Sequence, residues 1–336
     1  MNSMTDAKQH PTHKIAVVIP CYRVRNHIIK VLSSIGKEVS HIYVVDDCCP
    51  DNSGELVESQ CFDPRVKVLR NTVNQGVGGA VIRGYWQAIE DNIDVIVKVD
   101  GDGQMDPRLI KRFVAPILSG QADYTKGNRF YDLSNIDKMP RNRVFGNAAL
   151  SILAKLSTGY WDIFDPTNGY TAIHAKIAKH LPLEKISKRY FFETDILFRL
   201  NTFRAAVIDI PMDAVYGDEV SNLKISKIFG EFLIKHIRNF GKRIFYNYFL
   251  RNLTIASIEL MVGALLICFG GVYGLNHWIA SSREGIATPA GTVMLAAMPI
   301  LLGLQLILSF FSYDVAQVPS RAIHPSLIDL EDIVLR

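Results

Sequence analysis

A buried strand that ends in two carboxylates is the feature that most constrains how this chain can fold. Residues 95–107 read VIVKVDGDGQMDP, in which a β-branched run, broken only by Lys98, stops at Asp100 and Asp102. Such a run is typical of a strand inside a parallel sheet, and the glycines mark the turn where the chain leaves the sheet. Ligands bind at the carboxyl ends of strands in open α/β sheets, so the pattern predicts a binding site at this turn.

The Asp-x-Asp spacing at this turn suits a divalent cation. Asp100 and Asp102 place two hard oxygen ligands on one side of the turn, which favours Mg²⁺ or Mn²⁺ carrying a substrate diphosphate. A calcium-binding loop is excluded, because Met105 and Lys111 stand where such a loop needs glycine and glutamate. A polar turn that caps the following helix is the plainer alternative.

Strands alternate with helices over the first two thirds of the chain. Buried strands are predicted at residues 14–20, 41–45, 66–69, 95–99, 124–129 and 207–211. Segments between them, such as residues 25–35, carry apolar side chains at helical spacing. This alternation predicts an α/β fold with a mainly parallel sheet and helices on both faces.

Two more strand ends carry candidate binding residues. Asp46 and Asp47 follow the second strand, where paired acids can hydrogen-bond a base or ribose; a helix cap explains the polar residues after them but not this pair. After the third strand, residues 71–84 read NTVNQGVGGAVIRG, and glycines before a helix suggest close approach to a phosphate. The dinucleotide fingerprint does not fit, because Val81 stands where it needs glycine or alanine.

Further charged residues stand at later turns. Arg129 ends the predicted strand in YTKGNR and is available to a phosphate or carboxylate. Asp165 opens the turn DPTNGY. Glu193 and Asp195 head an apolar helix, where acids can equally serve the helix dipole.

The last third of the chain points to a membrane. Residues 253–275 and 288–311 are apolar runs, each close to the ~20 residues that cross a bilayer. Residues 225–250 carry apolar side chains at helical spacing with five lysines and arginines against one acid, which favours amphipathic helices on an anionic leaflet. A basic helix packed on the soluble domain is the alternative for this stretch, and a globular core pair is the alternative for the two runs. Basic residues concentrate before the first run, so the amino-terminal domain is expected in the cytosol.

Composition sets the compartment and excludes one class of partner. The 336 residues include five cysteines, an odd number without zinc-binding spacing, which indicates reduced thiols facing the cytosol. The first 14 residues lack an apolar core and do not read as a signal peptide. A net charge of +4 gives no reason to expect a nucleic-acid partner.

Five parts are therefore expected. They are a flexible tail (1–13), a cytoplasmic catalytic domain (14–223), amphipathic juxtamembrane helices (224–250), two transmembrane helices (251–312) and a cytoplasmic tail (313–336).

The order of the motifs resembles a known family. IPCYR, VVDDCCPDNSG, NQGVGGA, DGDGQMDP and GNR, followed by two apolar runs, resemble family 2 glycosyltransferases of the GT-A fold. More narrowly, the chain is similar to the polyprenyl-phosphate glycosyltransferases, the relatives of dolichyl-phosphate mannose synthase. The resemblance covers residues 14–230 by motif and the rest by architecture. Each motif alone is weak, but five in this order are specific.

The resemblance implies roles for the matching positions. Those that would bind the nucleotide sugar are Pro20, Tyr22, Asp46, Asp47, Gly76, Gly78, Gly79, Ala80, Asp100 and Gln104. The metal would be held by Asp100, Asp102 and Gln104. Phosphate or acceptor would be bound by Arg129, Ser221 and Lys224. The catalytic set would be Asp102, Asp165 and Glu193.

Two departures from the family pattern affect these roles. The small turn residues of the usual DDGS are replaced in the run Cys48-Cys49-Pro50, although the acids and Asp51 remain. The lysine often present in the NxGKG loop is Val77 here, which removes one side chain that would contact a phosphate.

The activity implied is inverting transfer of one sugar from a nucleotide diphosphate sugar to a polyprenyl phosphate, for cell-envelope glycan modification. A UDP-sugar donor is favoured and GDP-mannose is possible, with Mg²⁺ or Mn²⁺ as cofactor. The acceptor phosphate is mostly a dianion at neutral pH, so Asp165 and Glu193 are expected to position substrate rather than act as an essential base. The protein is expected in the inner membrane, where polar residues in the spans would suit a homo-oligomer.

Three alternatives to this activity differ in class. The first is a membrane glycosyltransferase for another glycolipid or a polysaccharide; processive synthases, however, usually have more spans and a QxxRW-like motif, which this sequence lacks. The second is an inactive GT-A membrane scaffold, against which the intact acids at 100 and 102 argue. A transporter is the poorest fit, because two spans per chain would have to assemble into a path.

Overall fold

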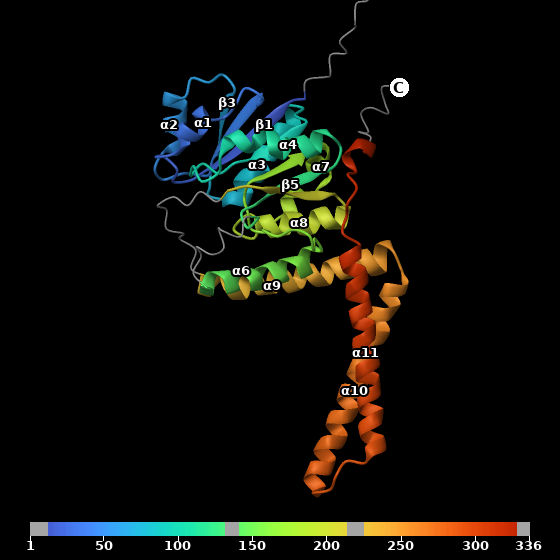
Figure 1. The fold of residues 1–336 in the computed structure, drawn as a ribbon. Coiled ribbons are helices and arrows are strands. Elements are labelled where there is room, and N and C mark those ends of the chain that lie inside the picture. The colour runs from blue at the N-terminus through green and yellow to red at the C-terminus, as the bar shows by residue number, and fades with distance from the viewer. Residues whose placement is uncertain (1–12, 132–140, 214–224, 328–336) are drawn as a thin grey trace, which may run out of the picture. The chain divides into compact units, whose positions relative to one another are not determined.

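A computed structural model describes residues 13–131, 141–213 and 225–327 (Figure 1). The chain divides into two compact units: Met1–Ile237 with Pro319–Arg336, and Arg238–Val318. The first unit contains the sheet, and the second contains two long apolar helices.

The described residues of the first unit form one seven-stranded sheet of order β3-β2-β1-β4-β6-β5-β7. The strands are β1 (Ile15–Cys21), β2 (His41–Asp46), β3 (Val66–Arg70), β4 (Val95–Lys98), β5 (Tyr124–Asn128), β6 (Thr171–His174) and β7 (Val207–Pro211). Neighbouring strands run parallel except at β6, which is antiparallel to both β4 and β5. The predicted α/β fold with a mainly parallel sheet is confirmed.

Helices of the first unit cover the sheet. They are α1 (Ile28–Ser33), α2 (Ser53–Gln60), α3 (Val77–Glu90), α4 (Ile110–Leu118), α6 (Arg141–Thr158), α7 (Ala175–His180) and α8 (Phe192–Phe203), with short turns η1 (Pro107–Leu109), η2 (Leu183–Lys185) and η4 (His324–Ser326). Alternate residues of β1 face opposite ways: Ile19 packs in one core cluster with α1 and α4, while Val18 faces α3. There α3 comes so close that a Cβ added to Gly84 would lie 2.3 Å from Val18 Cγ1.

The antiparallel strand β6 determines which loops meet at the site. Its first residue, Thr171, pairs with Lys98 at the end of β4 and with Lys126 in β5. The turn before β6 therefore lies at the same edge of the sheet as the carboxyl ends of β4 and β5. From the sequence only the turn DPTNGY is predicted here, because a four-residue strand shows too little periodicity to be recognised.

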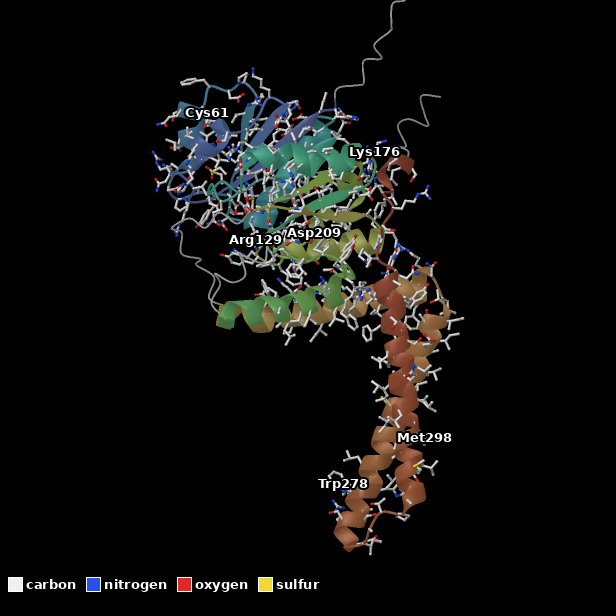
Figure 2. The ribbon with its side chains drawn as sticks, in the orientation of Figure 1. Cys61, Arg129, Lys176, Asp209, Trp278 and Met298 are labelled. Atoms are coloured by element: carbon white, nitrogen blue, oxygen red, sulfur yellow. The ribbon has the colours of Figure 1, made fainter. Side chains whose placement is uncertain are left out.

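The second unit is a helix pair. Helix α9 (Ile225–Phe245) and the π-helical turn η3 (Tyr246–Arg251) precede α10 (Ile255–Glu284) and α11 (Ala290–Ala316). By length and composition, α10 and α11 are both able to cross a membrane. They pack at glycines, since a Cβ on Gly263 would lie 2.9 Å from the carbonyl oxygen of Gly303. Figure 2 shows Trp278 and Met298 on the outside of the pair, where both are exposed.

Polar residues in this unit find partners within the chain. Ser309 of α11 donates to Glu259 of α10 at 2.9 Å, so this polar residue of the first apolar run faces a helix of its own chain. The homo-oligomer stays a prediction. Arg243, one of the basic residues expected on the membrane face, is instead buried against Asp314, with Nη1–Oδ1 at 2.6 Å. The hydroxyl of Tyr248 donates to the same oxygen at 2.7 Å.

The segment after α11 returns to the first unit. Asp123, buried just before β5, accepts hydrogen bonds from the backbone N–H groups of Ile323 and His324, at 3.0 and 2.8 Å. The His324 ring also contacts this carboxylate, at 2.8 Å, and stacks on His174 with centroids 4.1 Å apart. Residues before and after the helix pair along the chain therefore belong to the unit that contains the sheet.

Candidate active site

The turn after β4 carries the two predicted metal ligands. Asp102 accepts a hydrogen bond from the Gln104 N–H at 2.9 Å, which closes the turn. Asp106 caps the following helical turn by accepting from the Arg108 N–H at 3.0 Å. Helix capping therefore explains why an acid stands at Asp106, and closure of the turn partly explains Asp102. Neither role explains Asp100.

Asp100 is held by the lysine that interrupts the apolar run. Lys98 is 1% exposed, and its Nζ lies 2.8 Å from Asp100 Oδ1 and 3.4 Å from Glu193 Oε1. Burial alone would lower the pKa of Lys98, but the two carboxylates outweigh it and hold the pKa above its ordinary value. The lysine is therefore a buried cation that joins the end of β4 to the first turn of α8.

A glycine in the turn before β6 makes room for this ion pair. A Cβ at Gly169 would lie 2.5 Å from Lys98 Nζ and 2.9 Å from Asp100 Oδ2. Both distances are too short for real contacts, so a side chain at this position would displace the pair. Three segments that are distant in sequence thus converge on Asp100.

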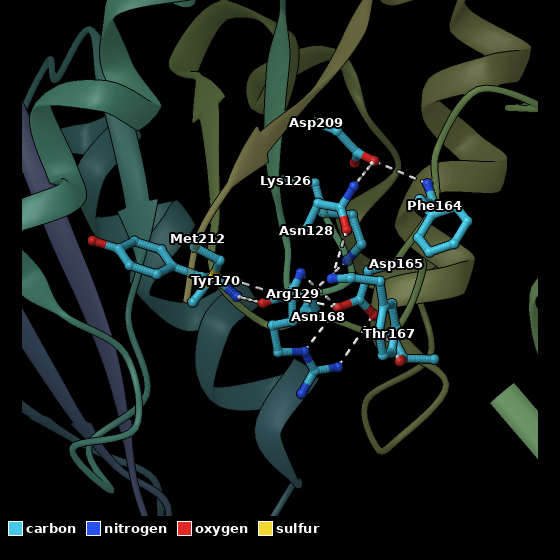
Figure 3. Close-up of polar contacts among 11 residues, drawn as sticks. Lys126, Asn128, Arg129, Phe164, Asp165, Thr167, Asn168, Tyr170, Asp209 and Met212 are labelled. Atoms are coloured by element: carbon cyan, nitrogen blue, oxygen red, sulfur yellow. Dashed lines mark hydrogen bonds and ion pairs between the residues drawn. The ribbon is translucent and has the colours of Figure 1, made fainter. Parts of the chain in front are cut away.

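Arg129 and Asp165 form a second ion pair, drawn in Figure 3. The Arg129 guanidinium binds both carboxylate oxygens of Asp165, through Nε at 2.8 Å and Nη2 at 3.1 Å. Asp165 is fully buried, whereas Arg129 is one third exposed. The fork holds the arginine in one orientation while leaving part of it accessible to a ligand.

Two buried groups near this fork have shifted pKa values. Burial lowers the pKa of Lys126 to about 8, and the ammonium donates to the carbonyl oxygen of Asn168. Burial raises the pKa of Asp209 to about 6; its Oδ2 accepts from the Phe164 N–H at 2.9 Å and from Asn128 at 3.1 Å. Sequence reasoning missed Lys126 and Asp209, although a lysine inside a buried strand was a usable signal.

The acids after β2 organise loops. Asp46 accepts from the N–H groups of Cys49 and Gly54, at 2.8 and 3.1 Å, and so shapes the entry to α2. Asp47 accepts from the N–H groups of Gln75 and Gly76, at 2.9 and 2.7 Å, and so ties the β2 end to the glycine-rich loop. Both are buried. Their recorded partners are protein groups, and a nucleotide contact stays a prediction for both.

Close packing explains the glycine-rich loop. Gly76 has φ of 85°, in the left-handed region, and a Cβ there would lie 2.7 Å from the Lys188 carbonyl oxygen. A Cβ at Gly78 would lie 2.6 Å from the Ser187 carbonyl oxygen. The N–H of Gly79 donates to Lys188 at 3.0 Å, and Ala80 is buried in α3. These glycines admit the segment before α8, so the loop does not require a phosphate to account for its sequence.

The remaining predicted positions lie on two sides of this arrangement. Pro20 is the last but one residue of β1, and Tyr22, directly after the strand, is 42% exposed and so accessible to a planar base. Cys48 adopts φ of 54° in the loop where the family pattern has small turn residues. Ser221 and Lys224 lie outside the described residues.

The donor set suits a hydrated divalent ion. Among the described residues no group of three or more His, Cys, Asp or Glu side chains could hold a metal by itself. Mg²⁺ and Mn²⁺ are typically bound by one or two carboxylates together with water and substrate phosphates. Asp100 is 29% exposed, and its Oδ1 is the oxygen in contact with Lys98, so Asp100 and Asp102 together fit this kind of site.

Comparison with known proteins identifies the family. Residues 16–181 match the family model for glycosyl transferase family 2. An undecaprenyl-phosphate mannosyltransferase from Micrococcus luteus is 28% identical over 229 residues, covering 67% of this chain and 93% of the relative. A UDP-N-acetylglucosamine–dolichyl-phosphate N-acetylglucosaminyltransferase from Methanococcus voltae is 26% identical over 218 residues, covering 61% and 86%.

A solved structure shares the fold. Glucosyl-3-phosphoglycerate synthase from Mycobacterium tuberculosis, in complex with Mn²⁺, UDP-glucose and phosphoglyceric acid, aligns with a TM-score of 0.52 at 18% identity, over 69% of this chain and 79% of the synthase. The sheet and this likeness define the GT-A fold. Residues 16–181 therefore form a glycosyl transferase family 2 domain.

Proposed function

We propose that this protein transfers one sugar from a nucleotide diphosphate sugar to a polyprenyl phosphate, with inversion at the anomeric carbon. The observation that carries the proposal is the pairing of two sites at one sheet edge. The acids after β4 suit a metal-bound diphosphate, and the Arg129–Asp165 fork beside them suits a phosphate acceptor. Relatives named for polyprenyl and dolichyl phosphate acceptors support the lipid.

Asp100 and Asp102 would hold the metal, and Gln104 would help to position the diphosphate. The ion supplies Lewis-acid stabilisation of the charge that develops on the departing diphosphate. The nucleotide would lie over Tyr22 and the loop that Asp47 ties down. The protein's own contribution is to keep these carboxylates fixed before the donor arrives.

The acceptor needs orientation more than activation. A phosphate monoester is mostly a dianion at neutral pH, so its attack requires little help from a base. Asp165 is buried and occupied by Arg129, and Glu193 is occupied by Lys98. Both acids are therefore assigned positioning roles, and Arg129 is assigned the acceptor phosphate. Ser221 and Lys224 are proposed to lie on the acceptor path.

The helices of the second unit would place this chemistry at a membrane. Helices α10 and α11 are long and apolar enough to span it, and the segment after α11 docks on the sheet-containing unit through Asp123. On α9 the exposed apolar residues Ile234 and Ile237 lie in the same stretch as exposed Arg238. We infer an inner-membrane protein with its catalytic domain in the cytosol, where polyprenyl phosphate is met at the bilayer surface.

A donor panel tests the proposal. The purified full chain is incubated with Mn²⁺, undecaprenyl phosphate and radiolabelled UDP- or GDP-sugars in parallel, including GDP-mannose and UDP-N-acetylglucosamine. A lipid-extractable product from one donor, lost on chelation, is the expected result. Metal-dependent nucleotide binding without product from any donor would indicate that the acceptor is not undecaprenyl phosphate. Absence of nucleotide binding would favour the inactive scaffold.

A further inference from the structure

Lys98 is the residue of the site that no motif accounts for. It lies in a strand of valine and isoleucine at the centre of the sheet, where burying a charge costs several kcal/mol unless the charge is paired. An apolar residue would pack there at no such cost. The lysine is therefore explained by what its ammonium group touches, namely Asp100 and Glu193.

The two partners come from different parts of the fold. Asp100 follows β4 and is proposed to bind the metal, whereas Glu193 lies in α8, 95 residues beyond Lys98. Both carboxylates are mostly buried, with side chains 29% and 12% exposed. Without a cation between them the two carboxylates would repel each other and lose hydration, so Lys98 offsets one of their two negative charges when no metal is bound.

We propose that Lys98 is a positioning residue that acts as an internal counter-ion, holding Asp100 and Glu193 in place and weakening the affinity of the free protein for a divalent cation. The inference rests on the proposed function, since it takes Asp100 as a metal ligand. A metal approaching Asp100 meets a fixed positive charge in direct contact with that carboxylate. A metal that arrives with a diphosphate brings anionic charge that offsets this repulsion. Lys98 thus favours binding of metal and donor together over binding of metal alone.

The geometry around the pair limits other ways of arranging it. Gly169 leaves space for Lys98 Nζ, and a Cβ there would approach it to 2.5 Å. Asp100 Oδ1 is the oxygen in contact with the lysine, at 2.8 Å, which orients the carboxylate toward the turn. A lysine with only a structural role would not need a glycine that leaves space for its ammonium group. Nor would it need acids from two separate elements in contact with that group.

The test measures Mn²⁺ binding without donor or acceptor. The full chain in detergent is titrated with Mn²⁺, and the free ion is followed by electron paramagnetic resonance. The change is Lys98→Met, with Lys98→Gln as a second neutral variant that keeps a donor for Asp100. Lys126→Met is the matched control, because Lys126 is equally buried and its ammonium donates to a carbonyl oxygen instead.

Loss of the Lys98 charge should tighten Mn²⁺ binding at least about tenfold, a modest value for the repulsion between a unit charge and a divalent ion that share one carboxylate. The Lys126 variant should change Mn²⁺ affinity less than about threefold. Unchanged or weaker binding in a folded Lys98 variant, or equal tightening in both lysine variants, would overturn the inference. Sugar transfer by the wild type is assayed separately, so failure of the proposed function is seen independently of this result.

Discussion

Removing the Asp123 carboxylate should release the segment that follows the apolar helix pair. The Asp123 carboxylate accepts hydrogen bonds from the backbone N–H groups of Ile323 and His324, and from the Ala206 N–H at 2.8 Å. It also contacts the His324 ring. Hydrogen bonds to a charged group contribute about 1.5–3 kcal/mol each. Counting only the two backbone bonds from the segment at the lower value, Asp123→Ala should weaken docking by about 3 kcal/mol.

Hydrogen exchange measures this loss directly. A loss of about 3 kcal/mol in the free energy of docking raises the population of the released state roughly 100-fold. The amides of Ile323 and His324 should then exchange roughly 100-fold faster. Asp63→Ala is the control, because Asp63 is a partly exposed carboxylate paired with Arg65, and it should leave exchange at both amides unchanged. Unchanged exchange at Ile323 in a folded Asp123→Ala protein would show that this carboxylate does not hold the segment in place.

The same contact should respond to acid. Burial would raise the pKa of Asp123, but hydrogen bonds from His324 and the backbone outweigh it and keep the pKa below its ordinary value. A carboxyl with a depressed pKa in the folded state contributes stability above its unfolded pKa, and this stability is lost as the pH falls through the folded value. The segment should therefore stay docked at neutral pH and release only below about pH 4.

Three further changes probe the fold. Burial raises the pKa of Asp209 from 3.8 to about 6, so between these values the folded state binds more protons than the unfolded state and its stability falls as the pH rises. In urea unfolding between pH 4 and 6.5, wild type should lose about 2 kcal/mol of stability relative to Asp209→Asn, and parallel curves would contradict this. Asp314→Asn should destabilise the helix pair by about 3–5 kcal/mol in detergent, because Arg243 would keep a buried charge without its counter-ion; an unchanged melting temperature would count against the pair. Gly84→Ala should cost about 1–3 kcal/mol through collision with Val18, and a neutral effect would show that α3 can move away.

The fold was predictable because periodicity and strand ends are local signals. The Asp-Gly-Asp turn, the alternation of strands and helices, and both long apolar helices could be read from neighbouring residues alone. The short strand β6 could not, since its four residues become a strand only by pairing with β4 and β5. Its antiparallel direction, in turn, brings Asp165 to the site.

The internal organisation of the site depends on contacts that no local pattern contains. The sequence indicated that Arg129 could meet a phosphate or carboxylate, and its carboxylate partner Asp165 is 36 residues away. It assigned the glycine at 76 to a phosphate, which stays a prediction, but it gave no sign of the close approach of the Lys188 backbone to this glycine. In the sequence, Lys98 only interrupts an apolar run. Its partner Glu193 could not be recognised there, because the packing of α8 brings that carboxylate to the lysine.

In the proposed function the acids after β4 bind the leaving diphosphate, whereas Asp165 and Glu193 only position substrate. The most direct measurement compares sugar transfer to undecaprenyl phosphate by wild type, Asp102→Asn and Glu193→Gln, using the best donor from the panel. Wild type should give a lipid-extractable product, Asp102→Asn should give none, and Glu193→Gln should give a measurable amount. Wild-type levels of product from Asp102→Asn, or equal and total loss in both variants, would contradict this assignment of roles.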